Sequence, residues 1–181
     1  MGTVIYWVHA SVDGFIDGPR GEFDWPVMGP ELSAYSEALD DRTTTLLYGR
    51  PVWEMMVGFW PDADRLGNDP HTRAFAPFWR ATPKLVVSSD YPGDNWTDRV
   101  IRPDDVRDLD GTILLTGGSG LAAALTERGL IDEYHVATHP VVLGGGKPLF
   151  AATDTRRTLD LRSSRVLDQN IVVNVYTLSR P

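Results

Sequence analysis

Residues 112–129, TILLTGGSGLAAALTERG, decide the fold. The first five residues are apolar or β-branched, as in a buried strand, and the residues from Leu121 onward have a helical composition. Only residues 117–120, GGSG, separate the two segments. The first N–H groups of a helix lack partners and carry partial positive charge, so a helix that starts on glycines can hold a phosphate. The stretch therefore predicts either a phosphate-binding turn or a tight strand-to-helix turn without a ligand.

Strands and helices alternate along most of the chain. Apolar runs rich in β-branched residues predict strands at 3–10, 43–49, 83–89, 99–102, 113–116, 133–138, 158–167 and 171–178. Helical spacing of apolar residues predicts helices at 30–41 and 71–80, besides one beginning at Arg50 and one after Gly120, with loops at 58–70 and 90–98. This order predicts an α/β domain whose sheet is mainly parallel, with an antiparallel hairpin at its C-terminal edge.

Several glycines and serines follow these predicted strands directly. Gly49, Ser88, Ser89, Gly117 and Gly118 all lie at carboxyl ends of strands. Ligands of open α/β sheets bind at that edge of the sheet. We therefore expect these residues to converge on one ligand.

Composition and charge exclude several function classes. The chain has 181 residues, of which 42% are hydrophobic and 23% charged, as in one globular domain spanning 1–181. It has no cysteine, so it has no disulfide and no thiolate metal site. The net charge of −8 argues against general binding to nucleic acid or to an anionic membrane, although local dipoles can still bind an anionic cofactor. Because the N-terminus lacks a secretory signal and Asp13 interrupts its apolar run, we expect a cytoplasmic protein.

Two further motifs leave alternatives open. Gly118-x-Gly120-x-x-Ala123 matches the loose dinucleotide fingerprint, which admits an NAD-type Rossmann enzyme, but too little chain follows for a doubly wound domain. His135 and His139 have the spacing of a metal-binding pair, yet no third ligand is evident, and we predict no metal site.

Taken in order, the segments resemble the dihydrofolate reductase-like superfamily, and most closely the reductase domain of bacterial riboflavin biosynthesis and its stand-alone relatives. The resemblance is carried by SVDGFID at 11–17, LLYGRPVWE at 46–54, LVVSS at 85–89, LTGGSG at 115–120 and DEYH at 132–135 through PVVLGGGKPLF at 140–150. It implies a three-layer sandwich with a mainly parallel central sheet, NADPH as cofactor, a small-molecule substrate and a homodimer. The glycine-rich loop at 144–147 is then either a loop closing over the site or a dimer contact.

The resemblance also implies cofactor contacts. Arg50 would bind phosphate at a helix start, although a surface ion pair is the alternative, and Trp53 would pack that helix on the sheet. Ser88 and Ser89 would lie near the adenosine 2′-phosphate. In relatives the paired glycines are joined by a cis peptide, so we predict one at Gly117–Gly118. The full implied set of cofactor-binding residues is His9, Ala10, Ile16, Gly49, Arg50, Pro51, Ser88, Ser89, Gly117, Gly118, Ser119, Gly120 and Leu121.

On the substrate side the implied residues are Ser11, Asp17 and Trp25. Asp13 is the candidate catalytic carboxylate, but an Asp before Gly also forms turns. Trp25 would stack on a flat heterocycle or serve as a core tryptophan. Dihydrofolate reductases carry an acid on the first helix, and the corresponding position here is Ser33.

The resemblance therefore implies an NADPH-dependent reductase that transfers hydride to a small heterocycle, either pterin-like or similar to 5-amino-6-(5-phosphoribosylamino)uracil. The alternative is a non-catalytic nucleotide-binding or assembly module on the same fold.

Overall fold

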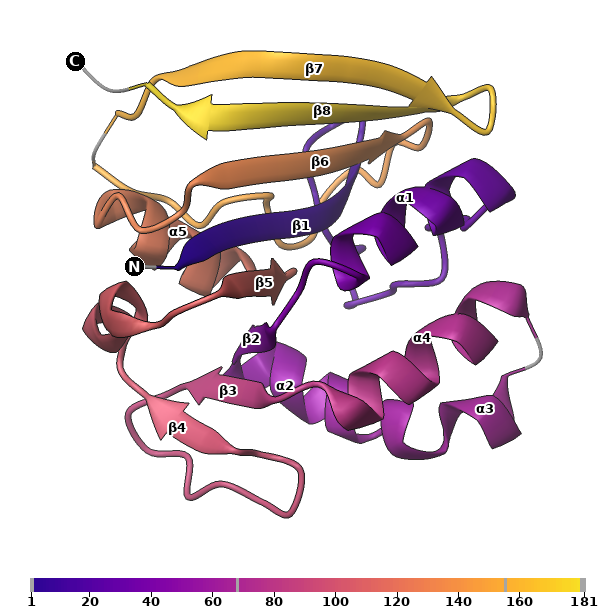
Figure 1. Cartoon of the computed structure of the whole chain (residues 1–181). Helices are drawn as coiled ribbons and strands as arrows, with labels where there is room; N and C mark the ends of the chain where they lie inside the picture. Colours follow the sequence, from indigo (N-terminus) through magenta and orange to yellow (C-terminus); the bar gives the residue numbers. More distant parts are fainter. Residues whose placement is uncertain (1, 68, 155, 180–181) are drawn as a thin grey trace.

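The computed structural model describes residues 2–67, 69–154 and 156–179, and its core is a single eight-stranded sheet (Figure 1). The strand order is β4-β3-β2-β5-β1-β6-β8-β7. Strands β1 to β6 pair in parallel, whereas β8 is antiparallel to β6 and to β7, as predicted. The bounds are β1 Thr3–Ser11, β2 Thr45–Gly49, β3 Lys84–Val87, β4 Arg99–Ile101, β5 Thr112–Thr116, β6 Glu133–His139, β7 Leu159–Leu167 and β8 Ile171–Leu178.

Helices cover both faces of this sheet. They are α1 Pro30–Asp40, α2 Arg50–Val57, α3 Ala63–Leu66, α4 Pro70–Ala81 and α5 Ser119–Glu127, with 3₁₀ turns at Trp60–Asp62 and Pro103–Asp108. The predicted loop at 58–70 is wrong in part, because it contains α3 and the first of these 3₁₀ turns. Both elements are shorter than two helical turns, and Arg80 of α4 holds them by bonding Asp64 and the Pro61 carbonyl. A periodic sequence pattern does not form over so few residues.

The two faces of β1 show how the layers form. Side chains alternate across a strand, so Tyr6 and Val8 pack with α5 on one face, whereas Ile5 and Trp7 pack beneath α1 and α4 on the other. All four are buried, which explains why β1 is a continuous apolar run rather than an alternating one. The result is the predicted three-layer sandwich.

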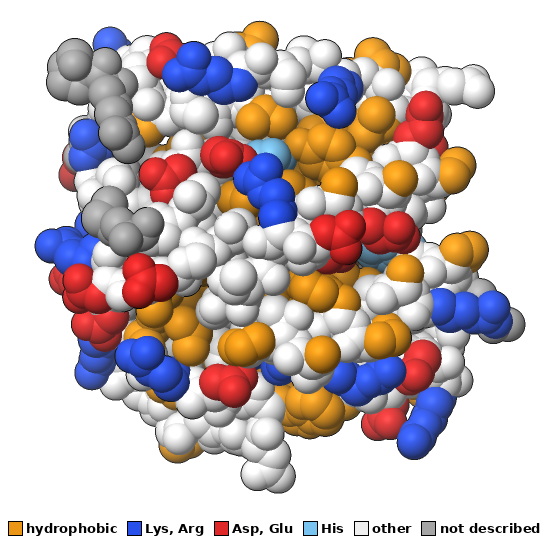
Figure 2. Space-filling model, in the orientation of Figure 1, with side chains coloured by type: hydrophobic (Ala, Val, Ile, Leu, Met, Phe, Trp, Pro, Cys, Tyr) orange, Lys and Arg blue, Asp and Glu red, His pale blue; other side chains and the backbone are white. Residues whose placement is uncertain are grey.

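The parallel register brings the carboxyl ends of the strands to one edge of the sheet. Gly49 lies opposite Val87 between β2 and β3, Trp7 opposite Thr116 between β1 and β5, and Ser11 opposite His139 between β1 and β6. This edge is where the predicted site residues meet. Basic and acidic side chains are interspersed over the molecular face in Figure 2, without a continuous basic patch there.

Candidate cofactor and substrate site

A groove of about 400 Å³ lies at the carboxyl ends of β2 and β3. Six of the predicted cofactor-binding residues line it, namely Gly49, Arg50, Pro51, Ser88, Ser89 and Leu121. Asp90 and Arg102 line it as well, and neither was expected from the sequence. The strand-end pattern thus located a real depression in the surface.

Two helix N-termini meet beside this groove. Neither α2, which follows Gly49, nor α5, which follows Gly118, has a side-chain cap, so their first N–H groups are free for another acceptor. The two turns are in close contact: a Cβ built on Gly49 would lie 3.4 Å from Leu121 Cβ, and one on Gly118 would lie 3.2 Å from Val52 Cγ2. The groove and the paired glycines therefore belong to one continuous edge.

The glycine turn differs from the prediction in one respect. The Gly117–Gly118 peptide is trans, so the expected cis bond is wrong. The chain reverses instead through two successive positive φ angles, +61° at Gly117 and +81° at Gly118. Glycine adopts this left-handed region without the steric cost of a Cβ, which explains the pair of glycines without a cis bond.

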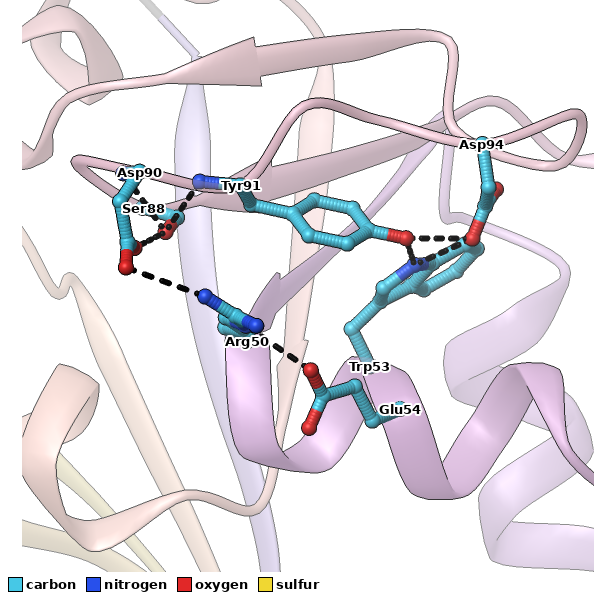
Figure 3. A network of polar contacts seen from close by, with 7 residues as sticks. All are labelled: Arg50, Trp53, Glu54, Ser88, Asp90, Tyr91 and Asp94. Atoms are coloured by element: carbon cyan, nitrogen blue, oxygen red, sulfur yellow. Dashed lines mark hydrogen bonds and ion pairs between the residues drawn. The ribbon is translucent and has the colours of Figure 1, made fainter.

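Arg50 is held at the rim of the groove by two carboxylates (Figure 3). Its Nε lies 2.8 Å from Glu54 Oε1 and its Nη1 lies 3.1 Å from Asp90 Oδ2, while the guanidinium lies 5.6 Å from the centre of the Tyr91 ring. The Ser88 hydroxyl and then Arg50 hold the pKa of Asp90 below its ordinary value. The ion-pair alternative for Arg50 is therefore confirmed as a contact. Both pairs are solvent-exposed, so a ligand phosphate can compete for the guanidinium.

Arg102 is a second cation in the groove. It follows β4 directly and its side chain is exposed. Among the described residues no carboxylate forms an ion pair with it. The signal that could have found it is the one that found Ser88, since both residues follow a parallel strand at the same edge.

Trp53 anchors α2, whose first residues line the groove. Trp53 is fully buried, stacks on Trp79 with ring centres 5.9 Å apart, and donates its Nε1–H to the Tyr91 hydroxyl and to Asp94, each at 3.0 Å. Above it, the Ser88 hydroxyl accepts from Tyr91 N at 3.2 Å and closes the turn after β3. The expectation that Trp53 packs α2 on the sheet is confirmed.

The loops after β1 and β6 are joined by backbone hydrogen bonds further along the edge, where an isolated antiparallel bridge pairs Phe15 with Pro148. Backbone bonds join Val12 N to the Val141 carbonyl and Ile16 N to the Lys147 carbonyl, at 2.9 Å and 2.8 Å. Gly146 lies against the backbone of Asp17 so closely that a Cβ there would clash. The glycine-rich loop is thus tied to the loop that carries the predicted substrate residues.

Asp13 and Asp17 of the β1 loop both bind the loop that follows β6. Asp13 accepts from Leu143 N at 3.1 Å and Gly144 N at 2.7 Å. The Ser11 hydroxyl, and then these N–H groups, lower the pKa of Asp13. Asp17 is buried and binds Lys147 through its backbone N–H at 2.5 Å and through Nζ at 2.7 Å. These carboxylates hold the loop after β1 against the loop after β6. For Asp13 this is the turn-forming role that the sequence offered as the alternative to catalysis.

A pair of histidines lies where β1 and β6 end. His9 Nδ1 and His139 Nε2 are 2.9 Å apart. Burial, followed by the fields of His139 and His71, lowers the pKa of His9 to about 3, and burial also lowers the pKa of His139. Both rings are therefore neutral near pH 7. The other predicted residues of this strand end, Ala10 and Ser11, are buried, and the Ser11 hydroxyl accepts from Phe15 N at 2.9 Å.

His139 pairs with His9 and not with His135, the residue at metal-pair spacing in the sequence. His135 instead contacts the Tyr35 hydroxyl at 2.6 Å and Glu133 at 2.9 Å, and the part of the chain that the structure describes contains no cluster of three metal-ligating side chains. His9 is the partner because the parallel register aligns the ends of β1 and β6 and turns both rings to the same sheet face.

Trp25 covers this histidine pair. Its ring meets His139 edge-on at 5.5 Å and Phe23 at 5.8 Å. The indole is partly buried, and its Nε1–H is buried without a hydrogen-bond partner. Since a buried donor is costly to leave unpaired, this N–H is a ready contact for a ligand acceptor.

The strand order and the three layers are those of the dihydrofolate reductase-like fold, and the groove lies at the carboxyl edge of that sheet. The RibD C-terminal domain family model matches residues 2–106 and 100–173, and the chain belongs to that family.

Individual relatives agree with this assignment. The chain is 30% identical to the uncharacterized protein YyaP of Bacillus subtilis (strain 168), over 96% of this chain and 93% of YyaP. A putative riboflavin biosynthesis protein from Shewanella sp. PV-4 has a similar fold, with a TM-score of 0.73 and 23% identity over 99% of this chain and 100% of that one. Dihydrofolate reductase from Enterococcus faecalis, solved with NADP(H), has a TM-score of 0.64 and 14% identity over 99% and 98% of the two chains.

Among the described residues, no helix has both the length and the apolar character needed to cross a bilayer.

Proposed function

We propose that this chain is an NADPH-dependent reductase that transfers hydride to a small, flat heterocycle, either pterin-like or similar to 5-amino-6-(5-phosphoribosylamino)uracil. One observation carries the proposal: six residues expected to bind the cofactor line a single groove that borders the paired glycines. Family membership and the reductase-like fold support the same conclusion.

The groove offers the chemistry that a phosphorylated dinucleotide needs. Arg50 and Arg102 would bind the adenosine 2′-phosphate, because a guanidinium can take phosphate bidentately, and Ser88 and Ser89 would donate further hydrogen bonds. The uncapped start of α5 would take the pyrophosphate. From β5 the next strand is β1, so the nicotinamide would extend toward His9, Ala10 and Ile16.

The substrate would lie against the end of β1, near Trp25 and the histidine pair. The helix position of the dihydrofolate reductase acid is Ser33 here, and Glu31, which precedes it on α1, takes no part in this arrangement. Glu31 accepts from Asp168 N at 2.5 Å, and Asp168 in turn accepts from the first N–H groups of α1 at 3.0 Å. Glu31 is therefore bound to the β7–β8 turn, and a substrate beside Trp25 and the histidine pair would be a neutral heterocycle recognised by aromatic and imidazole groups.

A thermal-shift titration with NADPH and NADH tests the cofactor assignment. A ligand that binds only the folded state at one hundred times its Kd adds about 2.7 kcal/mol of stability. We expect a clear rise in Tm with NADPH and a smaller rise with NADH. Absence of a shift with both would refute the proposal.

A non-catalytic nucleotide-binding module is the second candidate, favoured by the engagement of Asp13 and Asp17 in loop contacts. NADPH absorbance at saturating cofactor separates the two, with a dihydropterin and an aminouracil as acceptors. Oxidation of NADPH supports the reductase, whereas tight binding without oxidation supports the module. By resemblance we also expect a homodimer, which light scattering measures.

A further inference from the structure

His9 and His139 face each other from neighbouring parallel strands, 2.9 Å apart, so one ring donates an N–H and the other accepts it. Their outer nitrogens, His9 Nε2 and His139 Nδ1, have no hydrogen-bond partner among the described residues. His9 is partly exposed, while His139 is buried under Trp25. Each ring therefore has one nitrogen without a partner, and a single hydrogen bond joins the two rings.

A neutral imidazole carries one N–H and one bare nitrogen, which couples the two rings. When His139 Nε2 donates to His9 Nδ1, His9 must carry its proton on Nε2 and His139 Nδ1 must be bare. When His9 Nδ1 donates instead, both outer ends are reversed. The neutral pair thus always presents one donor and one acceptor at its ends, and these exchange when the bridging proton crosses while one end loses a proton and the other end gains one.

The surroundings keep the pair neutral. The sheet face that carries the rings is packed with aromatic groups, with Trp7 at 4.9 Å from the His9 ring and Trp25 at 5.5 Å from the His139 ring. The titratable group that acts on His9 from α4 is His71, whose charge would further disfavour an imidazolium. An imidazole that does not stay doubly protonated can still transfer a proton, because it can release one proton as it accepts another.

We propose that His9 and His139 form a two-ring proton relay that delivers a solvent proton to the substrate atom made basic by hydride addition, a role that rests on the proposed reductase function. The exposure of the two rings sets its direction. His139 is buried beneath Trp25, which is expected to contact the substrate, whereas His9 is partly exposed. His139 is the substrate end of the relay and His9 is the solvent end.

The relay balances protons and electrons. The reduced nicotinamide gives a hydride, with its electron pair, to the carbon of a C=N or C=O bond, and the π pair of that bond moves to the heteroatom. The heteroatom takes the proton from His139 Nδ1, His139 Nε2 takes the proton shared with His9 Nδ1, and His9 Nε2 takes a proton from solvent. The net change is uptake of one solvent proton, and neither ring is left charged.

The carboxylates of the neighbouring loop are poorly placed for this task. Asp13 accepts two backbone N–H bonds and Asp17 is paired with Lys147. The N–H bonds to Asp13 stabilise its ionised form, which has no proton to give, and Asp17 is held by Lys147. The histidine pair fills the role of proton donor that these acids leave open.

Histidine ¹⁵N NMR tests the relay without any substrate. We expect a nitrogen–nitrogen coupling between His9 Nδ1 and His139 Nε2, and ¹⁵N shifts intermediate between protonated and bare values because the two tautomer arrangements exchange. In His139→Gln, an amide can still bond to His9 Nδ1 but cannot pass a proton, so the His9 shifts should move to those of one fixed tautomer. Fixed tautomers in the unaltered protein, or no coupling, would overturn the relay.

Turnover gives an independent measurement, with NADPH and the dihydropterin and aminouracil probes. His139→Gln should lower kcat at least about tenfold, because general acid catalysis contributes about 10²- to 10⁴-fold, while the Kd for NADPH stays unchanged. His135→Gln is the matched histidine control and should keep its kcat. An unchanged kcat in His139→Gln contradicts the relay. Failure of the unaltered protein to oxidise NADPH contradicts the proposed function, and the NMR result still decides the relay.

Discussion

The two ends of the candidate site differ in charge and in the type of side chain that lines them. At the β2–β3 end the groove is open and charged, with Arg50 paired to exposed carboxylates and Arg102 beside it. At the β1–β6 end the site is closed and neutral, with His9 and His139 under the ring of Trp25. The carboxyl edge of the sheet thus carries charged side chains at one end and aromatic and imidazole side chains at the other.

This contrast indicates that the two ends of the sheet edge have different functions. Exposed ion pairs are weak because water screens them, so they can be exchanged for a phosphate at little cost. Buried neutral rings suit a flat heterocycle and the movement of a proton, because a low-dielectric environment excludes competing charge.

The largest effect is expected at the neutral end, as acid sensitivity of folding. The folded pKa of His9 is about 3, below its unfolded value near 6.5, so the unfolded chain binds the extra proton more readily. The stabilising effect of neutral His9 is complete above about pH 6.5 and is lost as the pH falls toward 3. Between about pH 6.5 and 4 this loss is on the order of 3 kcal/mol.

Urea unfolding of the unaltered chain and of His9→Asn at several pH values measures this effect. Asparagine keeps a hydrogen-bonding group near the Nδ1 position but does not titrate, so its stability should fall less steeply in acid. Arg65→Gln, at an exposed position on α3, is the control and should retain the original slope. Equal slopes in all three proteins would show that His9 does not control acid stability.

The next effect belongs to the charged end. Arg50→Ala should weaken NADPH about 10- to 100-fold, because a charge-assisted phosphate contact is lost. NADH, which lacks the 2′-phosphate, should weaken less. Isothermal titration calorimetry with both cofactors checks this, again with Arg65→Gln as the control. Equal weakening of both cofactors would move the phosphate site away from Arg50.

A smaller effect is expected at Asp13. Asp13→Asn removes the charge that accepts from Leu143 N and Gly144 N, so Tm should fall modestly while NADPH oxidation changes less than about twofold. Differential scanning fluorimetry and a turnover assay measure the two quantities. A loss of turnover of about a hundredfold with unchanged Tm would restore Asp13 as the catalytic acid.

The smallest effect concerns Asp90, which binds Arg50 at 3.1 Å in the groove. Asp90→Asn should tighten NADPH binding by about two- to fivefold, since an exposed charge pair is worth little and its carboxylate repels phosphate. NADH affinity should stay the same or decrease. Glu54→Gln, which removes the other carboxylate bound to Arg50, is the matched comparison. Weaker NADPH binding in Asp90→Asn would show that the carboxylate positions Arg50 productively.

Much of the fold was predictable because it depends on local patterns. The apolar run of β1, the glycine turn before α5 and the hairpin of β7 and β8 are each encoded by neighbouring residues. The strand-end rule then located Gly49, Arg50 and Ser88 beside one groove. The helical part of 58–70 escaped detection because it is too short to show a period.

Local sequence patterns specify which segments are strands and helices, and they place glycines and polar residues directly after the strands. They can do so because side-chain periodicity and backbone freedom act over a few residues. Tertiary structure decided the trans peptide at Gly117–Gly118, the place of Arg102 in the groove and the engagement of Asp13. It also decided that His139 meets His9 rather than His135. These features depend on strand register and on contacts between residues far apart in the chain, which no local pattern specifies.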